Sequence, residues 1–196
     1  MKAAPTMLHI PPRAELRRTP LETERLLLLP VDATDGEELW FAVNGSRGTL
    51  QPWLPWVQYH TDPAASGRFA EACAADWDQG RAVRFVIRER GSRAIAGIVG
   101  LEGCLHLHRS CELGYWLRHD ATRRGLMTEA ARATLDFAYR RMGAHRIRVA
   151  AATQNHDSLR VIARLGFRFE GLARQAEWCD GRWLDHATFG LLATDR

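Results

Sequence analysis

The sequence predicts a mixed α/β domain, with a mostly antiparallel central sheet of six to seven strands and about four flanking helices. Three stretches carry this prediction. Residues 112–137 are typical of an apolar strand, an arginine-rich turn and a helix, while residues 83–101 and 167–192 are typical of hairpins. Gly91-Ser92 and Asp180-Gly181 are the expected turns of these hairpins. Strands mixed with helices in this order indicate one sheet covered by helices.

The composition is that of an ordinary globular protein, with 46% hydrophobic and 26% charged residues in 196. No run of about 18 apolar residues exists, and the N-terminus lacks the apolar segment of a secretory signal. We therefore expect no membrane association and a cytoplasmic location. The spacing of the histidines and cysteines predicts no metal site and no disulfide framework, so we expect reduced thiols. The four cysteines are Cys73, Cys104, Cys111 and Cys179.

The net charge of +4 comes mainly from arginine, because Lys2 is the only lysine. Arginine contacts phosphate and carboxylate groups in bidentate geometry. The excess therefore fits nucleic acid, a phosphorylated cofactor or merely solvated surfaces. Basic and aromatic residues do not interleave on any expected sheet face, so direct nucleic-acid binding is not predicted.

The first elements follow from prolines and hydrophobic runs. Residues 1–20 carry four prolines and scattered arginines, which predicts a flexible or loosely docked N-terminal arm before a domain over residues 21–196. A first strand over residues 23–29 should end at Pro30. A helix is expected over residues 37–43.

Residues 50–60 form a compact aromatic segment that two prolines stiffen. Its rings, Trp53, Trp56 and Tyr59, either line a substrate pocket or cover the core, and both interpretations stay open. A helix over residues 64–79 follows, with apolar side chains at helical spacing.

The turn before the helix that follows Gly125 is the strongest candidate site. A helix start leaves its first N–H groups unpaired, and together with the positive end of the helix dipole these groups bind phosphate. Gly125 lets the backbone approach such an anion closely. The candidate residues are Arg123, Arg124, Gly125, Leu126, Met127 and Thr128.

Two further groups of residues stand out downstream. Asn155 is placed to cap a short helix, with Ser158 three residues later on its first turn. Glu177 precedes Trp178, and a carboxylate in such surroundings could act as a proton acceptor. Capping alone for Asn155 and Ser158, and a surface position for Glu177, are the plain alternatives.

Taken together, these motifs resemble the GNAT superfamily of acetyl-CoA-dependent N-acetyltransferases. The closer match is to its RimJ/RimL branch, the ribosomal-protein N-terminal acetyltransferases. The likeness spans residues 21–192 and is carried by Thr23-Glu24-Arg25-Leu26, Leu54-Pro55-Trp56, Glu112-Leu113-Gly114-Tyr115-Trp116-Leu117, Gly125-Leu126-Met127-Thr128-Glu129-Ala130, Asn155-x-x-Ser158, Arg164-Leu165-Gly166-Phe167, Glu170-Gly171 and Arg174-Gln175-Ala176-Glu177.

The resemblance implies a GNAT-like single domain with a V-shaped splay between strands 111–117 and 147–152, where acetyl-CoA would lie. Backbone groups near Trp116 and Leu117, together with Asn155, would hold the pantetheine arm. The N–H groups of residues 124–128 would hold the pyrophosphate.

The resemblance also implies roles in catalysis. Ser158 would protonate the departing thiolate, and Glu177 would accept the proton of the attacking amine, with Glu102 and Glu112 as the next candidate bases. A backbone N–H of the central strand would stabilise the oxyanion. The amine attacks directly, so no cysteine nucleophile is needed.

The identity of the acceptor stays open at this point. A protein N-terminus is the leading expectation, and a polyamine, an amino acid or an antibiotic is the alternative. A non-catalytic CoA-binding module is a rival that the presence of Ser158 and Glu177 disfavours. A homodimer is compatible with the family.

Overall fold

The computed structural model describes residues 7–92 and 94–196, and its strands form one sheet in the order β1-β2-β3-β4-β5-β6-β8-β7. Neighbouring strands are antiparallel except for the parallel pair β5–β6. The mixed, mostly antiparallel sheet is therefore confirmed, with eight strands in place of six to seven. The strands are β1 (Leu21–Glu22), β2 (Leu26–Pro30), β3 (Val83–Glu89), β4 (Ile95–Leu105), β5 (Ser110–Leu117), β6 (Arg146–Ala152), β7 (Arg168–Cys179) and β8 (Arg182–Leu192).

The additional strand, β1, lies before the first predicted strand, and residues 23–25 of that prediction form a tight turn. The Thr23 amide donates to the carbonyl of Leu26 at 3.0 Å, and the Leu26 amide donates to the Thr23 hydroxyl at 2.9 Å. Thr23 thus closes residues 23–26 on themselves, and β1 folds back on β2. The turn directs Arg25 toward the helix that follows β5, which matters for the site below.

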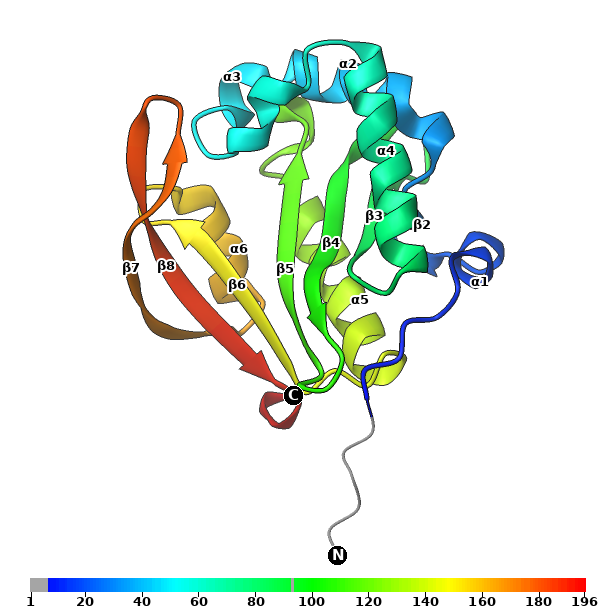
Figure 1. Cartoon of the computed structure of the whole chain (residues 1–196), viewed down its shortest axis with the longest axis vertical. Coiled ribbons are helices and arrows are strands. Elements are labelled where there is room, and N and C mark those ends of the chain that lie inside the picture. Colours follow the sequence, from blue (N-terminus) through cyan, green and yellow to red (C-terminus); the bar gives the residue numbers. More distant parts are fainter. Residues whose placement is uncertain (1–6, 93) are drawn as a thin grey trace, which may run out of the picture.

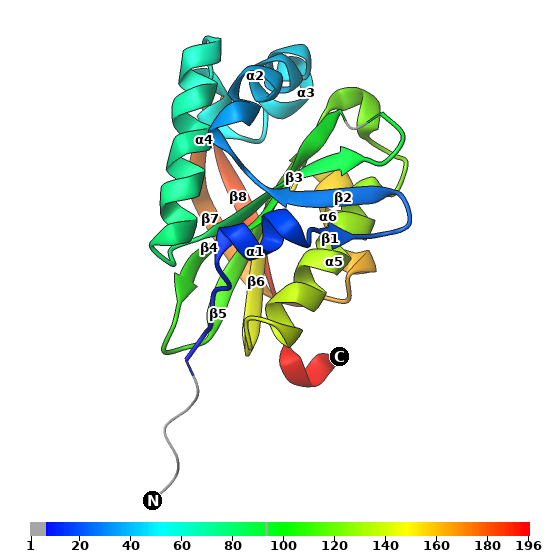
Figure 2. The ribbon, with the colours of Figure 1, turned by 90° about the vertical axis from the view of Figure 1, so that its right-hand side faces the viewer.

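Helices cover both faces of the sheet: α2 and α4 lie on one face, and α5 and α6 on the other (Figures 1 and 2). Four of the α-helices match predicted segments, while the short α1 and α3 were not predicted. The helices are α1 (Arg13–Arg18), α2 (Gly36–Gly45), α3 (Arg47–Leu50), α4 (Pro63–Asp78), α5 (Leu126–Arg140) and α6 (His156–Arg164).

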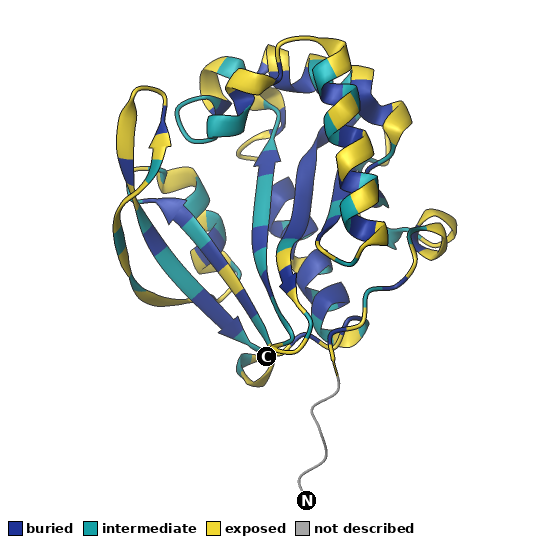
Figure 3. Ribbon diagram, in the orientation of Figure 1, coloured by how far each residue is buried: buried dark blue, intermediate teal, exposed yellow. Residues whose placement is uncertain are grey.

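The core is divided between the two faces of the sheet. The larger part packs α5 against the sheet, and Leu126, Ala130, Leu135 and Ala138 of this helix are at most 1% exposed. The inward side of α5 is dark blue in the burial view (Figure 3). Burial of each leucine contributes roughly 1.5–3 kcal/mol. The buried apolar face of this helix therefore anchors it, and with it the turn at its N-terminus.

Residues 7–20 are docked on the domain, so the prediction of a flexible arm is wrong for them. Leu8 and Leu16 are 4% and 0% exposed and belong to the main core. The indole of Trp77 donates to the carbonyl of Pro11 at 2.9 Å, and Arg13 pairs with Asp78. The prolines begin a short helix here and do not prevent packing. The part of the predicted arm in residues 1–6 lies outside the described residues.

β5 and β6 diverge after a short paired stretch. Their ladder runs only from the pair Ser110–Arg146 to the pair Glu112–Arg148. Beyond it the two strands separate, and the gap between them widens toward the N-terminal ends of α5 and α6 (Figure 1). This V-shaped splay confirms the predicted opening at the centre of the sheet.

Candidate active site

The turn between β5 and α5 presents a row of free backbone N–H groups. Gly125 is the N-cap residue of α5 and has a φ of +78°, in the left-handed region that favours glycine. None of the N–H groups of residues 123–128 donates a hydrogen bond to another described residue. Such N–H groups, at the positive end of a 15-residue helix, can bind a phosphate.

The side chains of this turn differ in what they can contribute. Leu126 and Met127 are 1% and 5% exposed, so these two residues can offer a ligand only their backbone. The guanidinium of Arg124 is paired with Glu89 at 2.5 Å. Arg123 forms no hydrogen bond or ion pair with the part of the chain that is described. It is therefore the more available positive charge of the two.

Side-chain hydrogen bonds that the sequence did not reveal hold the turn in place. Arg25 donates from Nε to Glu129 at 2.7 Å and from Nη1 to the carbonyl of Arg124 at 2.9 Å, while Thr23 donates to Glu129 at 2.6 Å. Burial alone would raise the pKa of Glu129, but the hydrogen bonds from Thr23 and Arg25 outweigh it and hold that pKa below its usual range. Glu129, on the outer face of α5, is thus bound to the turn between β1 and β2. The sequence signal that could have indicated these contacts was the motif Thr23-Glu24-Arg25-Leu26.

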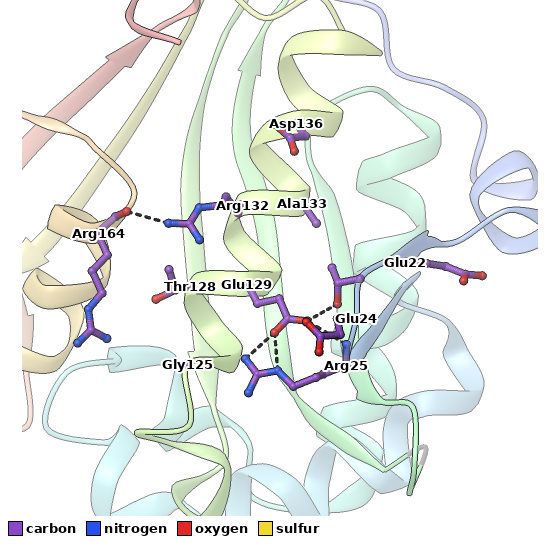
Figure 4. A pocket seen from close by; sticks show the side chains of 11 residues that line it. Glu22, Glu24, Arg25, Gly125, Thr128, Glu129, Arg132, Ala133, Asp136 and Arg164 are labelled. Carbon is purple, nitrogen blue, oxygen red and sulfur yellow. Dashed lines mark hydrogen bonds and ion pairs between the residues drawn. The ribbon is translucent and has the colours of Figure 1, made fainter.

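An open cleft of about 650 Å³ begins at this turn (Figure 4). The β1–β2 turn, the outer face of α5 and the end of α6 line it. Gly125 and Thr128 form its end beside the free N–H groups, and Arg132 donates to the carbonyl of Arg164 at 3.2 Å across it. The cleft can therefore accommodate the part of a nucleotide cofactor that extends beyond a pyrophosphate bound at the turn. Neither Arg132 nor Arg164 was predicted as a site residue.

A second helix start faces the splay from α6. The side chain of Asn155 accepts a hydrogen bond from the Ser158 amide at 3.1 Å, as predicted for a capping residue. The Ser158 hydroxyl lies 2.8 Å from the phenol oxygen of Tyr115, which comes from β5. Sequence reasoning missed Tyr115, because its partner is 43 residues away.

The C-terminal part of β5 has backbone groups that can bind a ligand in the splay. Residues 113–117 have no partner in β6, since the ladder ends at Glu112. On the other side they pair with β4, where Gly97 is opposite Leu117. Trp116 is 8% exposed, so its side chain is not available to a ligand. Trp116 and Leu117 can instead contribute backbone groups along this edge, which would otherwise be unsatisfied.

Glu177 lies where β7 is distorted by a bulge between Ala173 and Glu177. Its carboxylate is 3.4 Å from Nε2 of His186. His186 is in register with Ala152, the last residue of β6, three positions before Asn155. The ladder thus brings Glu177 and His186 to the end of the splay where α6 begins. His186 had not been singled out.

The other carboxylates considered as bases are already engaged. Glu102 accepts two hydrogen bonds from Arg84, and Glu112 is paired with Arg148 at 2.9 Å. Both glutamates lie near the closed end of the splay, because Glu112 belongs to the last paired rung. Glu177 is better placed, since it lies beside a histidine and not beside a guanidinium.

The aromatic segment divides between core and surface. Trp56 packs against Trp116, with ring centroids 5.9 Å apart, and stacks on Phe69. Trp53 packs on the small cluster at the β7–β8 hairpin, under the guanidinium of Arg182. Tyr59 is 71% exposed. Trp53 and Trp56 are therefore brought toward the splay and the hairpin, whereas Tyr59 is not held near either.

The thiols are not suited to nucleophilic catalysis. All four cysteines are free and buried. Burial raises the pKa of Cys73 to about 12 and also raises that of Cys179. The hydrogen bond with Cys104, and then burial, raise the pKa of Cys111.

Among the described residues there is no cluster of three potential metal ligands, and no helix has the length and hydropathy needed to span a bilayer.

Comparisons with known proteins agree with this geometry. Residues 25–168 match the model of the acetyltransferase (GNAT) domain family. The chain is 30% identical over 189 residues to the [ribosomal protein uS5]-alanine N-acetyltransferase of Escherichia coli, covering 93% of this chain and 95% of that protein. It therefore aligns with that enzyme over nearly its full length.

Solved structures show the same fold. RimJ of Mycobacterium smegmatis in complex with CoA-disulfide has a TM-score of 0.81 at 28% identity, over 87% of this chain and 83% of that one. A RimL acetyltransferase in complex with coenzyme A has a TM-score of 0.83 at 21% identity, over 95% and 97% of the two chains. With a family match over most of its length, the chain belongs to the GNAT family, on the side of the ribosomal-protein N-acetyltransferases, and is an acetyl-CoA-dependent N-acetyltransferase.

Proposed function

We propose that this enzyme transfers the acetyl group of acetyl-CoA to the α-amine of a protein N-terminus, by direct attack of the amine on the thioester. The observation that carries the choice of acceptor is the full-length match to an enzyme named for acetylation of ribosomal protein uS5. An open splay ending between two helix N-termini and Glu177 is compatible with a polypeptide end entering from the β7–β8 side.

In this proposal the cofactor lies along the splay. The N–H groups of residues 124–128 hold the pyrophosphate, and Arg123 adds charge. The nucleotide end extends into the cleft beside Arg132 and Arg164. The free edge of β5 at Trp116 and Leu117, together with Asn155, holds the pantetheine arm.

The reaction then needs two proton transfers and one site for developing negative charge. The neutral amine attacks the carbonyl carbon, and its proton passes to Glu177. A free N–H of β5 stabilises the oxyanion. The carbon–sulfur bond breaks, and Ser158 donates its proton to the thiolate, where that proton stays as the thiol of CoA. Glu177 then releases the amine proton to solvent, and solvent supplies a proton to Ser158, so the enzyme returns to its starting state. The products are CoA and an amide, and no acyl-enzyme forms.

A panel of acceptors tests this assignment. We expect CoA release with peptides that begin with alanine or serine to exceed release with polyamines or free amino acids by about 100-fold in kcat/KM, because remote contacts contribute to transition-state binding. The matched control is the same peptide with an acetylated N-terminus and an internal lysine, which should be inert. Preference for a small amine would move the acceptor to that class. Tight acetyl-CoA binding without turnover of any acceptor would instead indicate a CoA-binding module.

A further inference from the structure

Two hydroxyl groups, one from β5 and one from α6, lie next to each other. Tyr115 extends from β5, and its phenol oxygen lies 2.8 Å from the Ser158 hydroxyl and 3.3 Å from the Ser158 carbonyl. The Ser158 amide is already held by Asn155. The hydroxyl and carbonyl of Ser158 are therefore held by a neighbour in the strand, and its amide by the helix cap.

The direction of the Ser158 proton depends on Tyr115. A serine hydroxyl has one proton and two acceptor positions. Burial raises the pKa of Tyr115 to about 12, against the lowering effect of its hydrogen bond with Ser158, so the phenol keeps its proton at neutral pH. When Tyr115 donates to Ser158, the proton of Ser158 is left for another acceptor. Besides Tyr115, no described residue forms a hydrogen bond with this hydroxyl.

We propose that Tyr115 is a positioning residue that donates to the Ser158 hydroxyl and thereby directs the Ser158 proton at the thioester sulfur. This inference rests on the proposed role of Ser158 as proton donor and deepens it. It does not depend on which amine is acetylated. Tyr115 keeps its own proton in this proposal, and only the Ser158 hydroxyl donates to the sulfur.

The chain provides a matched control in Tyr139. This tyrosine is also partly buried, and burial likewise raises its pKa to about 12. Its hydroxyl donates to the carbonyl of Leu191 at 2.7 Å, between α5 and β8. Removal of this hydroxyl costs a hydrogen bond of the same kind without touching Ser158.

The test measures turnover and cofactor binding for Tyr115→Phe, Ser158→Ala, their combination and Tyr139→Phe, with the best acceptor found. We expect Tyr115→Phe to lower kcat about tenfold or more while the Kd for CoA changes less than about twofold. Tyr139→Phe should leave both values near wild type. In the Ser158→Ala background the second substitution should have no further effect, because Tyr115 acts only through that hydroxyl.

Three results would overturn the inference. Tyr115→Phe could keep the wild-type kcat, or it could weaken CoA binding as much as it lowers kcat, which would indicate a purely structural bond. It could also lower kcat as strongly without Ser158 as with it. An unchanged kcat in Ser158→Ala would also overturn the inference, because Ser158 would then not be the proton donor. The acceptor preference and the role of Glu177 would not be affected by that result, because they are measured separately.

Discussion

Gly125→Val is expected to abolish acetyl-CoA binding, with a Kd raised by at least about 100-fold, equivalent to about 2.7 kcal/mol. Gly125 lines the cleft at the start of α5, and its φ of +78° is costly for any residue with a Cβ. A Cβ there would lie 3.5 Å from the Arg25 guanidinium, an ordinary contact. The two methyl groups of the valine would then occupy the space in which a phosphate reaches the free N–H groups. Calorimetric titration with acetyl-CoA measures the effect.

Gly143→Val separates backbone strain from the loss of a phosphate site. Gly143 follows the other end of α5, has a φ of +70°, and a Cβ there would meet nothing within 4 Å. Both substitutions should lower the free energy of unfolding by roughly 1–2 kcal/mol. Only the change at Gly125 should affect the Kd for acetyl-CoA. Equal affinities for both variants would contradict the assignment of the turn.

Glu177→Gln is expected to lower kcat by about 10²–10³-fold at neutral pH, because an amide cannot accept the proton of the amine. The Kd for acetyl-CoA should change little, since the proposed cofactor contacts lie on β5 and on the two helix starts. Stopped-flow or steady-state release of CoA measures the rate, and calorimetry measures the Kd.

Glu170→Gln provides the control for Glu177. Glu170 lies on the same strand, at the other register shift of β7 between Phe169 and Gly171, and is paired with Arg146. We expect this variant to retain wild-type turnover, apart from a small loss of stability of about 0–1 kcal/mol for a partly exposed ion pair. Wild-type turnover of Glu177→Gln would move the base elsewhere, and Glu112 and Glu102 would be tested next.

Local patterns were enough to predict the parts of the site that depend on neighbours in sequence. Gly125 at a turn before an amphipathic helix, and Asn155 three residues before Ser158, define helix starts through hydrogen bonds within a few residues. The strand order near the site followed from hairpins and from the resemblance. These features are confirmed in place, although their ligand contacts stay proposals.

The features that sequence reasoning missed all depend on long-range packing. Arg25 meets Glu129 across 104 residues, and Tyr115 meets Ser158 across 43. No periodicity in one segment indicates which distant side chain it will face. Residues 7–20 were mistaken for an arm because prolines and arginines dominate their composition, while the burial of Leu16 depends on a surface formed by other elements.

A crystal structure with CoA bound tests the central claim most directly, namely that the splay and its two helix starts hold the cofactor with its sulfur at Ser158. We predict pyrophosphate oxygens within about 3 Å of the amide nitrogens of residues 124–128. We also predict the CoA sulfur next to the Ser158 hydroxyl, at the end of the splay toward which Glu177 lies. A pyrophosphate bound away from the β5–α5 turn, or a sulfur remote from Ser158, would contradict the account.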